Sequence, residues 1–77
     1  MPLFRISIVN EHYSSTNEHE CADAAAAGRH AIKGALAIAA DEVANGDPFF
    51  AAEVKVEGGG GPVSRYVISV GASPLKA

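Results

Sequence analysis

Basic residues, cysteine and aromatic side chains are all scarce in this sequence. A single cysteine, Cys21, excludes an intramolecular disulfide bond. Six lysine and arginine residues stand against nine acidic ones, which gives a formal net charge of −3. Proteins that bind nucleic acid cluster basic side chains against the phosphates, and the six basic residues here form no tract. The composition therefore disfavours nucleic acid as a partner.

The sequence also lacks long apolar runs and cofactor motifs. No segment approaches the roughly 20 apolar residues of a membrane-spanning helix, and the first residues do not resemble a signal peptide. The glycine run at residues 58–61 leads into Pro62 and a strand-like segment, whereas phosphate-binding loops lead from a strand into a helix. We therefore expect no membrane span, no cofactor and a cytoplasmic location.

The length of 77 residues is that of one small domain. Chains of this size bury only about 60% of the surface that they expose when unfolded, so their stability is marginal. Small domains without disulfides or metal sites commonly gain stability by oligomerising. We therefore expect a homo-oligomer, specifically a dimer. A different protein as the partner is the second possibility.

An alanine-rich segment predicts one long helix over residues 24–45. Asp23 can accept hydrogen bonds from the free backbone N–H groups of the first turn, and the alanines that follow have the highest helix propensity. Asn45 and Gly46 tolerate the left-handed conformation that often ends a helix. Pro48 prevents the helix from resuming.

Segments on both sides of the helix alternate between apolar and polar residues, as half-buried strands do. Phe4 and Ile6 mark the first of these segments, and Val54 and Val56 mark the second. The polar segment before the helix predicts a loop, in which a short strand around Tyr13 is left open. The expected boundaries are a strand at residues 3–9, a loop at 10–22, a hairpin at 51–57 and 63–70, and a frayed tail at 71–77.

These elements predict an α+β fold in the order β-α-β-β. The sheet is expected to be antiparallel, with three strands, or four if Tyr13 lies in one. The long helix would cover one face of this sheet, so that the domain has two layers. The pattern does not determine the order of the strands in the sheet.

The helix has two apolar faces when residues are placed at 100° intervals. Ile32, Leu36 and Val43 lie on a narrow stripe, which we expect to contact the sheet. Gly28 and Gly34 each cost about 1 kcal/mol relative to alanine, a cost that close approach to another element would explain. The second face consists mostly of small residues; it either contacts a partner subunit or contains alanine simply as a helix former. The predicted interface residues on this second face are Ala24, Ala27, Ala31, Gly34, Ala35 and Ile38.

Side chains with reactive groups gather between residues 11 and 21. His12, His19 and Cys21 are candidate metal ligands, but their spacing matches no common zinc framework. Residues of this kind in a polar loop are usually solvated, and we expect no functional metal site. Cys21 has no identifiable third group to orient His19 as a base, and His30 is expected to face solvent. The sequence therefore predicts no catalytic residue and no enzyme.

Several landmarks occur together along the chain. They are the Met1-Pro2 start, an aromatic first strand with Phe4, Asp23 at the head of an alanine-rich helix, and a final strand at residues 66–70. In this layout the chain resembles a family of short bacterial proteins of unknown function. The resemblance supports the fold and implies no catalytic residues. A more distant likeness, in strand pattern and helix placement, is to HicB-type antitoxin domains, which bind a toxin partner.

The sequence thus predicts a non-enzymatic cytoplasmic interaction module that self-associates through the small-residue face of its helix. The alternative is an antitoxin-like regulator associated with nucleic acid or a toxin. That alternative requires Arg5, Lys55 and Arg65 to line up on the exposed face of the sheet, and the alternation of their strands does place them outward.

Overall fold

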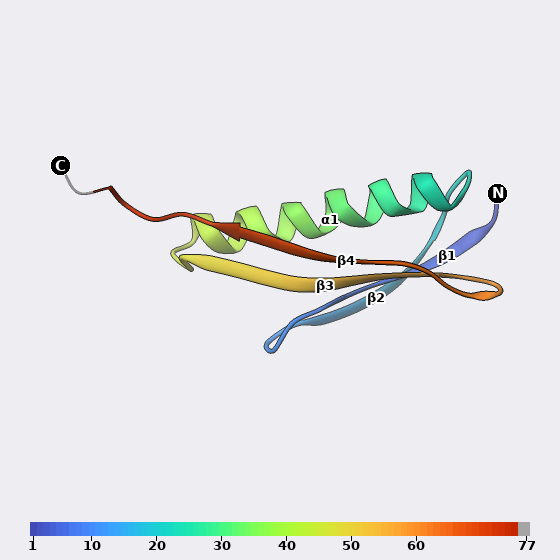
Figure 1. Cartoon of the computed structure of the whole chain (residues 1–77), viewed down its shortest axis with the longest axis horizontal. Helices are drawn as coiled ribbons and strands as arrows, with labels where there is room; N and C mark the ends of the chain where they lie inside the picture. The colour runs from blue at the N-terminus through green and yellow to red at the C-terminus, as the bar shows by residue number, and fades with distance from the viewer. Residues whose placement is uncertain (76–77) are drawn as a thin grey trace.

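A computed structural model describes residues 1–75 and shows one helix and four strands within them (Figure 1). The strands form one antiparallel sheet in the spatial order β2-β1-β3-β4. The predicted α+β class and antiparallel sheet are therefore confirmed. The sheet has four strands, although Tyr13, on which the expected fourth strand depended, lies outside all of them. The elements are β1 Leu3–Val9, β2 Ser14–Glu20, α1 Ala24–Ala44, β3 Phe49–Gly58 and β4 Gly61–Gly71.

Strand β2 corrects the predicted loop at residues 10–22. It pairs with β1 along its whole length, from Leu3 opposite Glu20 to Val9 opposite Ser14. Tyr13 lies in the turn between the two strands, where its carbonyl oxygen accepts a hydrogen bond from the backbone N–H of Asn10 at 2.8 Å. Because β2 is an edge strand and β1 supplies the buried side chains, β2 shows no apolar alternation by which it could be recognised.

Helix α1 begins at the predicted cap and ends one residue before the predicted end. The carboxylate of Asp23 accepts a hydrogen bond from the backbone N–H of Ala26 at 2.8 Å. At the other end Gly46 has φ +112°, and its N–H donates to the carbonyl of Val43 at 3.2 Å. Asn45 keeps φ −87°, so Gly46 alone takes the left-handed conformation. Within residues 1–75, no helix has the length and apolarity needed to cross a membrane.

The hairpin of β3 and β4 reaches further into the glycine run than expected. Gly58 pairs with Gly61, which has φ +120°, so the turn proper is only two residues long. The register shifts between Val56 and Glu57, where Glu57 lies opposite Pro62. Such a bulge accommodates a proline, which cannot donate a backbone hydrogen bond to the ladder.

The first two residues of the predicted frayed tail, Gly71 and Ala72, make regular backbone contacts. Gly71 is the last residue of β4, and the N–H of Ala72 still donates to the carbonyl of Pro48 at 3.0 Å. The chain then extends past the sheet (Figure 1). Residues 76 and 77, which belong to the predicted tail, lie outside the described part of the chain.

The core combines small residues of α1 with large residues of the strands. The helix packs mainly against β3 and β4 and runs beside them (Figure 1). Its buried residues are all alanine or glycine, which allows the helix to lie close to the side chains of the sheet. The large buried residues on the strands are Phe4, Ile6, Ile8, Phe50, Val54, Val56 and Ile68.

The small-residue face of α1 therefore contacts the sheet of its own chain, and the predicted helix orientation is wrong. Ala27, Ala31 and Ala35 are at most 1% exposed, whereas Leu36 is 42% exposed. The helix is rotated by about 70° from the expected orientation when 100° is counted per residue. Of the predicted interface residues, these three alanines cannot meet a partner, because β-strands of the same chain already cover them. Ala24 and Gly34 remain exposed, and Ile38 is partly buried.

Candidate functional site

The predicted metal ligands lie apart in three different settings. His12 is in the exposed β1–β2 turn, where its Nε2 is 3.3 Å from the Glu11 carboxylate. His19 extends from β2 toward His30 of α1, and their ring centroids are 4.4 Å apart. Cys21 is buried in the core. No group of three or more histidine, cysteine or acidic side chains within residues 1–75 is placed to hold a metal ion.

A groove of about 260 Å³ lies between α1 and β2 beside the His19–His30 pair. Ile6 and Ile38 provide apolar walls, and Asn17 adds an amide. Gly34 also lines this groove, and nothing lies within 4 Å of the position where its Cβ would be. The expected close approach is thus present at Gly28, not at Gly34. The groove exists because α1 packs over β3 and β4 and leaves β2 largely uncovered.

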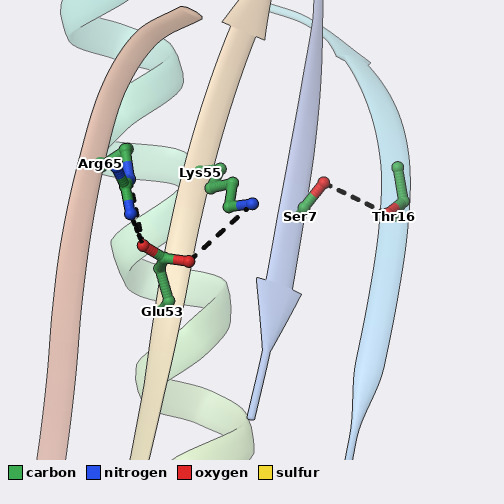
Figure 2. Close-up of polar contacts among 5 residues, drawn as sticks. All are labelled: Ser7, Thr16, Glu53, Lys55 and Arg65. Carbon is green, nitrogen blue, oxygen red and sulfur yellow. Dashed lines mark hydrogen bonds and ion pairs between the residues drawn. The ribbon is translucent and has the colours of Figure 1, made fainter.

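The face of the sheet opposite the core carries a small network of charges (Figure 2). We call this the outer face. The Glu53 carboxylate accepts hydrogen bonds from Arg65 Nε at 3.0 Å and from Arg65 Nη2, and Lys55 Nζ lies 3.9 Å from its other oxygen. The Arg65 hydrogen bonds lower the pKa of Glu53, partly opposed by desolvation of its carboxylate. On the neighbouring strands, the Ser7 and Thr16 hydroxyls are hydrogen-bonded at 3.2 Å (Figure 2).

The three basic residues of the nucleic-acid alternative do share the outer face. Arg65 and Lys55, however, both approach Glu53. Arg5 sits in register between Glu18 of β2 and Glu57 of β3. Each basic side chain thus has an acidic neighbour, so the outer face presents no uncompensated basic patch.

A pocket of about 470 Å³ opens beside the β1–β2 turn. Val9, Phe49 and Val67 supply apolar walls, and Glu11 and Glu53 supply carboxylates. Phe49 is 60% exposed. The pocket therefore contributes exposed apolar surface at one end of the outer face, next to β4.

The two edges of the sheet differ in chemistry. Edge strand β2 has the sequence SSTNEHE and presents polar or charged side chains on both faces. Edge strand β4 has the sequence GPVSRYVISVG, in which Arg65 is the single charged residue. Val63 and Val67 of β4 are 41% and 78% exposed. Native proteins usually protect edge strands with charges, proline, bulges or short length. Pro62 and the bulge protect only the beginning of β4, and from Val63 to Gly71 Arg65 is the one charged residue.

One side of α1 adds to the apolar surface next to β4. Gly28 lies against Tyr66 of β4, since a Cβ at Gly28 would be 2.6 Å from the Tyr66 hydroxyl. Ile32 and Leu36 follow at intervals of four residues and lie on the same side of the helix. Ile32 is partly buried and Leu36 is exposed. We call Val63, Val67, Ile32 and Leu36, together with the free backbone of β4, the β4 edge surface.

Sequence reasoning missed the β4 edge surface for two reasons. It predicted no strand order, so β4 was not known to be an edge. It also expected Leu36 to contact the sheet. The available signal was the near absence of charge in the last strand, combined with Val67 at an outward position of the alternation.

A helix inserted between two hairpins of one antiparallel sheet defines a small α+β domain. The chain belongs to the family described as a domain of unknown function (DUF6894), which matches residues 3–68. This match runs from β1 into β4. No curated protein and no solved structure matches the chain. The resemblance to a family of proteins of unknown function is confirmed, whereas the likeness to HicB-type antitoxin domains is not.

Proposed function

We propose that this protein is a non-enzymatic interaction module that self-associates as a homodimer. The observation that carries the proposal is its large surface. The single chain exposes 5247 Å², whereas a typical folded monomer of 7.9 kDa exposes about 4,400 Å². Its radius of gyration is 14.1 Å, against about 11.5 Å for a compact chain of this length. The extended segment after β4 adds to both values (Figure 1).

Exposed apolar side chains support the same proposal. Val67, Phe49, Leu36 and Val63 are all more than a third exposed, and all four lie on the helix or the strands, away from the chain ends. The single cysteine allows no intramolecular disulfide that would offset the small core. A second copy that covers part of this surface would supply the missing apolar burial, at about 25 cal/mol per Å².

In this proposal the domain has two layers, with α1 on the core face of the sheet and the outer face free. The lone, buried Cys21 is compatible with a reducing compartment such as the cytoplasm. A non-enzymatic role is supported by the setting of the reactive side chains, because the Cys21 thiol is buried and the His19 ring lies against another imidazole.

Light scattering coupled to gel filtration tests self-association directly. We expect a mass of twice the 7.9 kDa chain at high protein concentration and a decrease toward 7.9 kDa on dilution. A mass of 7.9 kDa at every concentration up to the millimolar range would contradict the proposal. Far-ultraviolet circular dichroism at the same concentrations serves as the control that the chain remains folded.

A further inference from the structure

We infer that two copies of this chain associate through the β4 edge surface, with the two β4 strands antiparallel, so that the sheets join into one continuous sheet. The inference rests on the proposed self-association and names its surface. The occupant of this surface is a second copy of the same chain, related by a two-fold axis that crosses β4.

The free backbone of β4 is the first argument. With 11 residues, β4 is the longest of the four strands. It lies at the end of the sheet and pairs with β3 on one side only. Alternate backbone N–H and C=O groups of such a strand point away from the sheet. An edge strand of this kind is a template for another strand, and a second β4 would bond to these groups along its length.

The contrast between the two edges is the second argument. A second β2 beside β2 would bring four like charges onto the outer face, Glu18 and Glu20 of both copies, whereas a second β4 beside β4 brings two. In β4 the single charged side chain, Arg65, is already hydrogen-bonded to Glu53 of its own chain. Pairing centred on Tyr66 would place Arg65 opposite Val67 of the second copy, which keeps the two arginines apart. The charge pattern therefore permits self-pairing at β4.

The apolar side chains next to β4 are the third argument. Val67 on the outer face and Leu36 on α1 lie on the two sides of the β4 edge, and both are exposed. A strand that adds to β4 would lie against both of them, so hydrogen bonding and apolar burial would occur together. To form an interface of standard size, each copy would bury about 800 Å² around the β4 edge.

The decisive experiment introduces a lysine on the β4 edge surface and, in a separate variant, a lysine on the β2 edge, and compares the dissociation constants of the two dimers. In Val67→Lys a lysine replaces a side chain that is 78% exposed, so the monomer has little reason to unfold. Thr16→Lys is the matched control, because Thr16 is exposed on the outer face of β2. We expect Val67→Lys to raise the dissociation constant of the dimer by at least about tenfold, and Thr16→Lys to leave it unchanged.

Each outcome decides between the two proposals. If the wild type is a monomer, self-association itself fails. If the wild type is a dimer and Val67→Lys leaves the dissociation constant unchanged, or Thr16→Lys weakens the dimer equally, self-association stands and the β4 edge surface is wrong. If Val67→Lys does not fold, Leu36→Glu is compared with Ala37→Glu, since both residues are exposed on the helix. Leu36 follows Gly28 and Ile32 at intervals of four residues on the side of α1 next to β4, and Ala37 does not. Weakening by Leu36→Glu alone would support the inference, and equal effects of the two substitutions would overturn it.

Discussion

Gly28 and Gly34 lie on the same helix, and their surroundings differ. A Cβ on Gly28 would come within 2.6 Å of the Tyr66 hydroxyl and 3.5 Å of its Cζ, whereas a Cβ on Gly34 would meet nothing within 4 Å. Both glycines lower helix propensity by a similar amount. The close contact of α1 with β4 therefore explains the first glycine, and the structure gives no packing reason for the second.

We predict that Gly34→Ala stabilises the folded chain by about 0.5–1 kcal/mol, because alanine restricts the unfolded chain and has higher helix propensity. Thermal or urea unfolding at a fixed protein concentration measures this change. Gly28→Ala is expected to destabilise the chain, and adding Tyr66→Phe should recover at least half of the loss by removing the contacting hydroxyl. Equal effects of alanine at the two positions would contradict this account of Gly28.

Glu53 is the acidic residue through which β3 and β4 interact on the outer face. Its pKa is lowered in the folded chain, chiefly by the Arg65 hydrogen bonds. In the unfolded chain this contact is absent, so the unfolded state takes up the proton at a higher pH than the folded state. The stabilisation by Glu53 is therefore complete above its unfolded pKa and is lost as the pH falls through its folded pKa.

We predict that Glu53→Gln removes this pH-dependent contribution. The variant should be less stable than the wild type at about pH 7, and the difference should shrink as the pH falls to about pH 3. Urea unfolding at several pH values measures it, with Glu57→Gln as a control. A difference that is the same at all pH values would show that the Glu53–Arg65 contact does not contribute through charge.

At the level of whole elements, the orientation of α1 depends on the size of the side chains opposite it. The sheet already supplies phenylalanine, isoleucine and valine to the core, so the helix face with alanine fits closest. Helical periodicity alone favoured the stripe with Ile32 and Leu36, because those residues are more apolar. Periodicity shows which residues share a face of the helix. It contains no information about the volume of the strand side chains that this face must pack against.

We predict that Ala35→Leu destabilises the folded chain by about 1–3 kcal/mol, because Ala35 is fully buried and the added atoms would overpack the core. Ala37→Leu is the matched control, since Ala37 is exposed on the same helix and should change stability by less than about 0.5 kcal/mol. Chemical denaturation measures both variants. If Ala35→Leu is neutral, the alanine face is not packed against the sheet as described.

Local signals predicted most elements well. Asp23, Gly46 and Pro48 marked the helix ends to within one residue, because capping and left-handed exits depend on adjacent residues. The alternation around Ile6 and Val54 located β1 and β3. Strand β2 was missed because it is held mainly by backbone hydrogen bonds to β1. Such pairing does not require alternating apolar side chains, which are the pattern used to recognise the other strands.

At the scale of the whole molecule, the charges of the outer face argue against recognition of nucleic acid. We predict no binding to duplex DNA at about 50 mM salt, because each basic residue of that face has an acidic neighbour. Fluorescence anisotropy of a labelled duplex measures binding, with a strongly basic protein as a positive control. Binding that weakens steeply with added salt would contradict this prediction and favour the antitoxin-like alternative.

Local signals such as the low charge of the last strand do not define the whole β4 edge surface, because this surface depends on how distant elements pack together. Val67 and Leu36 are 31 residues apart, and they flank one edge only because β3 places β4 at the end of the sheet and α1 packs over both strands. The order of the strands and the rotation of α1 are determined only when all elements pack together, so no single segment of the sequence predicts them. The small-residue face of α1, which the sequence predicted as an interface, is largely covered in the same assembly.

Hydrogen exchange of the β4 amides tests the central claim most directly. In a monomer, the amides of β4 that point away from β3 are open to solvent and exchange fast. If two β4 strands pair, these amides are protected at protein concentrations where light scattering gives a dimer, and they lose protection on dilution, while the outward amides of β2 exchange fast throughout. Fast exchange of the outward β4 amides in a confirmed dimer would contradict the account.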